Sequence, residues 1–289
     1  MRMIILLALI LMVFSSVAFA TENTKTRIFL RADDYFTVSN SGTYIYGNSG
    51  RCTVTISSGV SGVTLDQNIG QINFLSPSSS YTFKQTGNII NIYDTTGTSL
   101  IVSAPVQGNN GTQLYFSNGT ASAKINRGTM TLGGVTVSFS TPTALNQAIS
   151  AGTFSITNTT KAKVFLYADV TYTVSNIGET LYGNNGSEVV NIKANISGVT
   201  LDQNIGQINL PDATSNYTFR QTGNIINVYD AAGVTLILTA PVQGTPVGTV
   251  FSFSNGLASA RLTNGVMTLG GAQLSSGVPT AITMLDSVT

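Results

Sequence analysis

The feature that most constrains the fold of this 289-residue chain is an internal duplication. The stretch 61–73, SGVTLDQNIGQIN, recurs without change at 197–209, 136 positions later. Other blocks repeat in the same order at nearly the same offset, among them QTGNIIN at 85–91 and 221–227 and MTLGG at 130–134 and 267–271. Two copies this similar build the same supersecondary unit, so the sequence predicts two homologous modules in tandem.

A shorter period lies inside each copy, because pairs of apolar residues in x-apolar-x-apolar alternation recur every nine positions. This alternation places both side chains of a pair on one face of a β-strand. Polar residues and glycines separate successive pairs, and helical spacing is not sustained after residue 20. The chain is therefore predicted to be all-β. In the first copy the two series are Ile45, Val54, Val63, Ile72, Tyr81, Ile90 and Ile56, Leu65, Phe74, Phe83, Ile92, Ile101.

Two architectures produce a nine-residue period. Short strands stack in parallel in a β-roll or solenoid, whereas five-residue strands joined by tight turns form an antiparallel meander. The turns Thr86-Gly87-Asn88 and 94–97 favour hairpins in the later part of each copy, since Gly adopts positive φ readily. The stretch 59–74 lacks such turns. We predict stacked β-roll strands followed by antiparallel hairpins, with a plain β-sandwich as the alternative.

The expected domain organisation follows from these patterns. Residues 1–20 resemble a secretory signal peptide, with Arg2, an apolar core at 4–14 and a small-x-small site at 18–20. An uncleaved anchor is the alternative, but this core is shorter than the ~20 residues that span a bilayer. The modules are then residues 21–139 and 163–289, and a connector occupies 140–162, where residues 144–151 are weakly compatible with a helical turn.

The composition narrows the choice of partners. Charged residues make up 9% of the chain, against about 25% in typical soluble domains, and the formal net charge is +1. No basic cluster points to nucleic acid, and no apolar run after the signal peptide is long enough to span a membrane. We expect a secreted protein, extracellular or at the cell surface. The single cysteine, Cys52, excludes an intrachain disulfide and is expected to be a partly buried thiol, with an intermolecular disulfide as the alternative.

Catalytic chemistry has few candidates in this sequence. The chain contains no His, which removes the usual general base near neutral pH and His-based triads. Two carboxylates alone can hydrolyse glycosides, but the only adjacent pair is Asp33-Asp34, and Val170 replaces Asp34 in the second copy. We therefore expect a protein that is not an enzyme, and we interpret this pair as a solvated strand end.

Several blocks resemble a known group of proteins. The motifs Tyr46-Gly47-Asn48, GVTLDQNI, YTFxQTGN, FSNG and MTLGG are similar to repeat modules of large exported bacterial surface proteins, the adhesin-like and haemolysin-type (RTX-like) repeat proteins. This resemblance covers nearly all of the chain after residue 20. It implies a role at the bacterial cell surface or in the extracellular matrix, and no catalysis by these modules.

Calcium is the one cofactor that the sequence raises. Carboxylate and amide oxygens recur at matching positions of both copies, and a hard cation needs six to eight oxygen ligands. The alternative is structural, because Asp at the start of a turn accepts hydrogen bonds from the backbone. The turns here carry one carboxylate or none, unlike the Gly-Gly-x-Gly-x-Asp turns of calcium-binding rolls. The calcium candidates are Asp66, Asn68, Asp94, Asp202, Asn204 and Asp230.

The sequence is compatible with two classes of function. The leading hypothesis is a non-catalytic structural or adhesive protein that self-assembles through open β edges, which few charges protect. The alternative is a carbohydrate- or surface-binding module, in which Tyr side chains supply stacking faces in the absence of Trp. The expected partner is accordingly another copy of the chain, or a surface polymer or glycan. The stacking candidates are Tyr44, Tyr46, Tyr93, Tyr115, Tyr182 and Tyr229.

Overall fold

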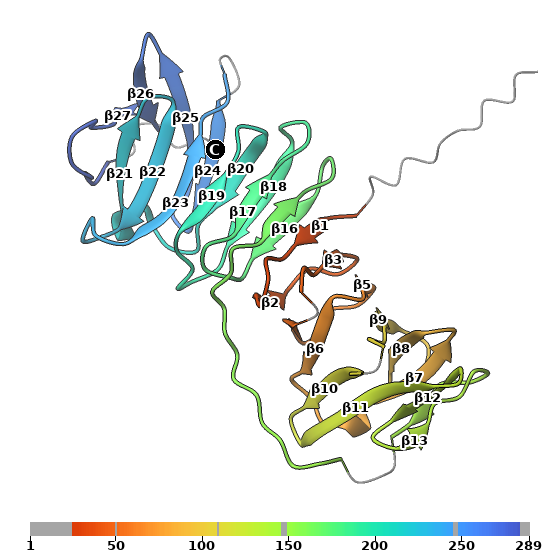
Figure 1. The fold of residues 1–289 in the computed structure, drawn as a ribbon. Coiled ribbons are helices and arrows are strands. Elements are labelled where there is room, and N and C mark those ends of the chain that lie inside the picture. The colour runs from red at the N-terminus through yellow and green to blue at the C-terminus, as the bar shows by residue number, and fades with distance from the viewer. Residues whose placement is uncertain (1–24, 50, 109, 146–148, 245–247, 284–289) are drawn as a thin grey trace, which may run out of the picture.

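The computed structural model describes residues 25–49, 51–108, 110–145, 149–244 and 248–283. These residues form 27 short strands and two single-turn 3-10 helices, so the chain is all-β (Figure 1). We call the strands from β1 (Arg27–Phe29) to β14 (Thr143–Ala144) the first half and those from β15 (Lys163–Phe165) to β27 (Ala272–Gln273) the second half. The two halves lie end to end and give the molecule an elongated shape.

The first half begins as a parallel β-roll with two strands per coil. Successive strands alternate between two facing sheets, so the nine-residue period of the sequence is half of one coil. One sheet contains β1 (Arg27–Phe29), β3 (Tyr44–Tyr46), β5 (Val63–Leu65) and β9 (Leu100–Pro105), all parallel. The other contains β2 (Tyr35–Val38), β4 (Cys52–Ile56), β6 (Ile69–Phe74) and β10 (Thr112–Phe116).

Antiparallel strands extend both sheets beyond this roll. A hairpin enters between β6 and β9 and turns at Gly87, whose φ of 60° fits the tight two-residue connection. The prediction of stacked strands followed by hairpins is confirmed. The added elements are η1 (Ser78–Ser80), β7 (Tyr81–Thr86), β8 (Ile89–Asp94), β11 (Gly119–Asn126), β12 (Thr129–Leu132), β13 (Val135–Thr136) and β14 (Thr143–Ala144).

The second half repeats this topology strand for strand up to β27, as the duplication predicts. Its roll strands are β15 (Lys163–Phe165), β16 (Thr171–Val174), β17 (Thr180–Tyr182), β18 (Glu188–Ile192), β19 (Val199–Leu201), β20 (Ile205–Asn209), β23 (Leu236–Pro241) and β24 (Thr249–Phe253). Its added elements are η2 (Thr214–Asn216), β21 (Tyr217–Thr222), β22 (Ile225–Asp230), β25 (Gly256–Thr263), β26 (Val266–Leu269) and β27 (Ala272–Gln273).

The core fills the space between the two sheets of each half. The apolar residues of the nine-residue series in the first copy point inward with one exception, and Val54, Val63, Ile72 and Ile90 are fully buried. The exception is Ile101, which is only partly buried because the register shifts where β8 pairs with β9, and its neighbour Val102 is buried instead. Removing such side chains from water is the main stabilising contribution, about 1.5–3 kcal/mol for each large aliphatic residue. The period that identifies the strands in the sequence therefore also supplies the core.

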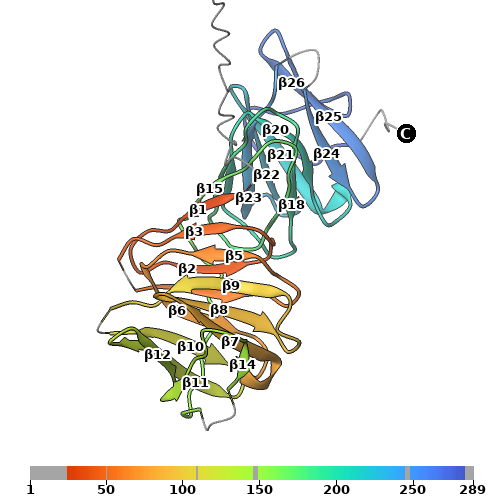
Figure 2. The same ribbon diagram turned by 90° about the vertical axis from the view of Figure 1, so that its right-hand side faces the viewer.

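A single continuous sheet joins the halves. Strand β1 pairs antiparallel with β15, with Ile28 opposite Val164, and this pairing creates a sheet of 13 strands (Figure 2). Ile28 and Val164 are equivalent positions of the two copies, so the junction has pseudo-twofold symmetry. Each half meets the other through the same surface, its first coil.

On the opposite sheets, the first coils meet through side chains. Asn40 binds both backbone groups of Thr173, through its Oδ1 to the N–H (2.8 Å) and its Nδ2 to the carbonyl (2.9 Å). The equivalent Asn176 binds Thr37 in the same way, at 2.8 and 3.0 Å. We call these four residues the asparagine clamp. The clamp pairs backbone groups of the edge strands β2 and β16, which would otherwise be open to another chain.

A buried carboxyl group supports one arm of the clamp. Glu179 accepts hydrogen bonds from Asn176 Nδ2 (2.8 Å), from the N–H groups of Asn176 and Ser175, and from the Tyr172 hydroxyl (2.9 Å). Burial disfavours its charged form more strongly than these donors favour it, and it raises the pKa of Glu179 to about 7. The orientation of Asn176 therefore depends on an unusually basic carboxyl.

The connector leaves the far end of the first half and returns along it to the junction (Figure 1). The expected helical turn at 144–151 is wrong for the residues described there: Ala144 belongs to β14, and Ser150 exchanges two hydrogen bonds with Thr120. Residues 146–148 and the predicted signal peptide lie outside the described residues. Within the described ranges, no helix is long and apolar enough to cross a membrane.

Removal of one clamp side chain should destabilise the protein. In Asn40→Ala, the N–H and carbonyl of Thr173 lose their partners, so we expect the free energy of unfolding to fall by about 1–3 kcal/mol. Urea denaturation measures this change. Asn224→Ala, at an exposed hairpin tip, is the control and should change stability by less than about 0.5 kcal/mol. Equal effects of the two substitutions would contradict the clamp.

Glu179 should make stability depend on pH in a defined window. Its pKa rises on folding from 4.5 to about 7, so the unfolded state releases the proton first. Protonated Glu179 stabilises the folded state fully below pH 4.5, and this stabilisation is lost as the pH rises to about 7. The total loss is roughly 3 kcal/mol, and no further loss is expected above that pH. The stability difference between wild type and Glu179→Gln, followed by urea denaturation across this window, should show this fall. A constant difference would contradict the assignment.

Candidate ligand-binding platform at the junction

Exposed aromatic residues gather where the two halves join. Strands β1 and β15 each have one buried central residue, so the residues on either side of it project outward. Phe29 is 42% exposed and Phe165 is 41% exposed. These two phenylalanines are equivalent in the duplication, and the antiparallel pairing brings them together.

Four rings form a zigzag across β3, β1, β15 and β17. Phe29 stacks on Tyr46 with ring centroids 4.8 Å apart, and Phe165 stacks on Tyr182 at the same distance. Between these stacks, Phe29 and Phe165 meet edge to face at 5.5 Å. Because the rings pack against one another on a continuous sheet, their orientations are set before any ligand binds.

Cationic side chains lie among the rings. The ammonium group of Lys25 sits over the Tyr44 ring, 4.7 Å from its centroid. The strand register places Lys163 opposite Phe29 and Arg27 opposite Phe165. We call this surface the platform: Lys25, Arg27, Phe29, Tyr44, Tyr46, Lys163, Phe165 and Tyr182.

A hollow of about 410 Å³ opens on the platform. Its lining residues include four aromatic rings and two cations, and none is acidic: Lys25, Arg27, Phe29, Phe165, Leu166, Tyr167, Tyr182, Gly183 and Asn184. Aromatic faces contact the C–H faces of sugar rings, and ammonium and guanidinium groups attract carboxylates or sulfates. The platform is therefore suited to an anionic polymer with flat apolar faces, such as an acidic glycan.

The structure brings together half of the tyrosines proposed for stacking. Tyr44, Tyr46 and Tyr182 belong to the platform. The other three lie on strands outside it: Tyr93 on β8, Tyr229 on β22 beneath the Arg220 guanidinium, and Tyr115 on β10 against Phe154 of the connector. Sequence reasoning missed Phe29 and Phe165, although both follow a buried β-branched residue at the same place in each copy.

The predicted calcium ligands in the repeated turn hold the backbone of adjacent coils. Asp66 Oδ1 accepts the N–H of Gly47 and the N–H of Asn68, both at 2.9 Å. Asn68 Nδ2 donates to the other carboxylate oxygen of Asp66 at 3.1 Å. The turn packs tightly, since a Cβ at Gly47 would lie 2.6 Å from the Asn68 carbonyl oxygen. Asp202 and Asn204 repeat these contacts with Gly183.

The remaining two calcium candidates open hairpin turns. Asp94 Oδ1 accepts from the Thr96 hydroxyl (2.8 Å) and the Thr98 N–H (3.1 Å), and Asp230 Oδ1 accepts the Val234 N–H (2.9 Å). Hydrogen bonds, with a threonine hydroxyl as the largest cause, lower the pKa of both carboxyls. Within the part of the chain that the structure describes, no three acidic, His or Cys side chains cluster as metal ligands. The geometry favours the structural interpretation of all six residues.

Cys52 and the acidic pair also have structural contacts. The Cys52 thiol is fully buried and donates to the Arg31 carbonyl at 3.1 Å. Its counterpart Glu188 is equally buried and accepts backbone N–H groups at 184–186. Asp33 forms an ion pair with Arg51, whereas Asp34 accepts the Thr160 hydroxyl of the connector. The two adjacent carboxylates thus serve different contacts.

Comparison with protein-family models, with curated proteins and with solved structures finds no match to this chain.

Chelation of calcium should leave the protein's thermal stability unchanged. The carboxylate oxygens of Asp66 and Asp202 accept hydrogen bonds from N–H groups, which a bound cation would have to displace. We expect the same Tm in calcium chloride and in excess EDTA, measured by calorimetry. Asp66→Asn should lower the Tm equally in both solutions. A Tm that rises with calcium in the wild type but not in Asp66→Asn would contradict this expectation and establish a calcium site.

Proposed function

We propose that this chain is a non-catalytic, exported adhesive protein of the bacterial cell surface or extracellular matrix, which attaches to an anionic glycan through the platform. The platform is the observation that carries this proposal. It combines four mutually packed rings with three cationic side chains on one face of a 13-stranded sheet. Contiguous exposed apolar surface of this kind commonly marks an interaction site.

Other observations support the absence of catalysis and the export of the protein. The chain has no His, and the Asp33–Asp34 pair is engaged in an ion pair and in the connector contact. Residues 1–20 have the pattern of a secretory signal peptide.

Self-assembly through sheet edges has less physical support than glycan attachment. The junction covers the edge strands β2 and β16, and the outer strands β13, β14 and β27 are each two residues long. The remaining outer strand, β21, is six residues long, and its open side is covered in part by backbone hydrogen bonds of Phe219 with Thr280 and of Gln221 with Ser275. Short or covered edges are poor templates for pairing with another chain. Attachment through the platform therefore ranks first.

Binding to acidic polysaccharides tests this proposal. We expect alginate or heparin to bind and neutral dextran not to bind, with affinity that falls as salt concentration rises. Phe29→Ala and Phe165→Ala should each weaken binding about fivefold, since an aromatic contact contributes roughly 1 kcal/mol. Phe139→Ala is the matched control, because Phe139 is 56% exposed and lies outside the platform.

Charge reversal separates the electrostatic contribution of the platform to binding from the contribution of its aromatic rings. Lys25→Glu with Lys163→Glu should abolish binding to the acidic polymers and change the Tm little, because Lys163 is exposed and Lys25 is only partly buried, with one cation–π contact to Tyr44. Affinity electrophoresis in polymer-containing gels measures all of these variants. Absence of retardation by either acidic polymer, or equal retardation of wild type and the charge-reversed variant, would refute the platform as the attachment site.

A further inference from the structure

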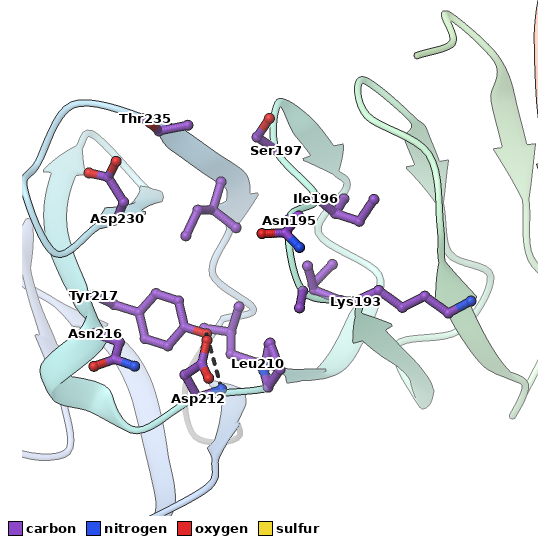
Figure 3. Close-up of a pocket in the computed structure, with 14 residues that line it drawn as sticks. Lys193, Asn195, Ile196, Ser197, Leu210, Asp212, Asn216, Tyr217, Asp230 and Thr235 are labelled. Carbon is purple, nitrogen blue, oxygen red and sulfur yellow. Dashed lines mark hydrogen bonds between the residues drawn. The ribbon is translucent and has the colours of Figure 1, made fainter. Parts of the chain in front are cut away.

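A second candidate site lies in the second half, away from the platform residues. It is a groove of about 360 Å³ between the turn at 193–197, after β18, and the segment 210–217 that leads into β21 (Figure 3). Asp230 and Thr235, from the turn between β22 and β23, line its third side. This volume falls in the lower part of the range for small-ligand pockets, about 300–1,000 Å³.

Comparison with the equivalent residues of the first half shows which lining residues are particular to this groove. Five of its 14 lining residues are the same in the first half, including Tyr217 and Asp230, which correspond to Tyr81 and Asp94. Four positions instead exchange a small residue for a long polar one, and one exchanges a large ring for a smaller side chain. These five differences are Ser57 to Lys193, Gly59 to Asn195, Ser76 to Asp212, Ser80 to Asn216 and Phe74 to Leu210. The other four differences add no polar group: Ser58 to Ala194, Val60 to Ile196, Leu75 to Pro211 and Ser99 to Thr235.

One of these exchanges carries a conformational cost. Asn195 has a φ of 63°, in the left-handed region where Gly59 stands in the first half with a φ of 79°. A side chain at this φ is disfavoured for every residue except Gly, although Asn tolerates it best. The second half therefore has Asn195, in a disfavoured backbone conformation, in the lining of the groove, whereas the first half has Gly59 at the equivalent position.

The polar groups suit a neutral polyhydroxylated ligand. The side-chain amides of Asn195 and Asn216 make no hydrogen bond to other described residues and are exposed, so each can donate and accept. Asp212 Oδ2 lies 3.4 Å from the Tyr217 hydroxyl and adds acceptors beside it. Lys193 directs its ammonium group away from the groove, to Ser39 Oγ at 3.0 Å, so it leaves no cation for an anion (Figure 3).

We infer that this groove binds a neutral sugar residue, as a glycan contact separate from the platform. Carboxylate and amide groups bind the sugar hydroxyls, while Ile196, Leu210 and Ile237 provide an apolar wall. The inference does not depend on the platform, because the two surfaces share no residue and differ in charge. The first half lacks this site, since Ser and Gly replace the four polar side chains and Phe74 replaces Leu210.

The first half supplies the residues for the test. Asn195→Gly, Asp212→Ser and Asn216→Ser together give the second half the residues that the same fold already carries in the first. We expect titration with glucose, galactose, N-acetylglucosamine and their disaccharides, followed by NMR or calorimetry, to show binding of at least one sugar. The triple variant should bind it about tenfold more weakly or not at all, because several hydrogen bonds are lost.

Two further variants make the outcome unambiguous. Phe29→Ala with Phe165→Ala should bind the sugar as the wild type does, which separates this site from the platform. Phe74→Leu with Gly59→Asn, Ser76→Asp and Ser80→Asn should raise the stoichiometry from one site to two. Failure of every sugar to bind, equal affinity of the triple variant, or binding of an organic cation such as choline in place of sugars would overturn the inference.

Discussion

The antiparallel pairing of β1 with β15 is the contact on which the rest of the structure depends. It joins one sheet of each roll into a single sheet of 13 strands and fixes Ile28 opposite Val164. The asparagine clamp completes the junction on the other sheets by pairing the edge strands through side chains. Because equivalent residues of the two copies meet each other, the surface that joins the halves is complementary to itself.

The platform is a consequence of this junction. Neither half alone contains the zigzag of four rings, since each contributes one Phe and one Tyr, and the edge-to-face contact of Phe29 with Phe165 exists only across the junction. The cations face the rings of the other half for the same reason, because β1 and β15 run in opposite directions. Duplication followed by head-to-head pairing thus creates a surface that a single copy does not have.

Much of the fold could be predicted from the sequence, because one physical signal repeats. The nine-residue alternation marks Val54, Val63 and Ile72 as inward-facing, and the Gly of the turn at 86–88 marks a hairpin. The junction could not be predicted, since pairing between β1 and β15 depends on residues that are far apart and on an orientation that no local pattern encodes. The platform's phenylalanines were missed for that reason. The six calcium candidates were chosen by residue type, and only the structure shows which N–H groups their oxygens accept.

Amide hydrogen exchange at Thr37 and Thr173 tests the junction most directly. Both N–H groups belong to edge strands and are bonded only by an asparagine side chain of the other half, at 2.8 Å. If the halves form one body through the clamp, these amides exchange slowly, at rates close to those of the neighbouring core strands. If the halves are independent, both amides exchange as fast as those of exposed edge strands, and the platform that depends on the junction does not exist.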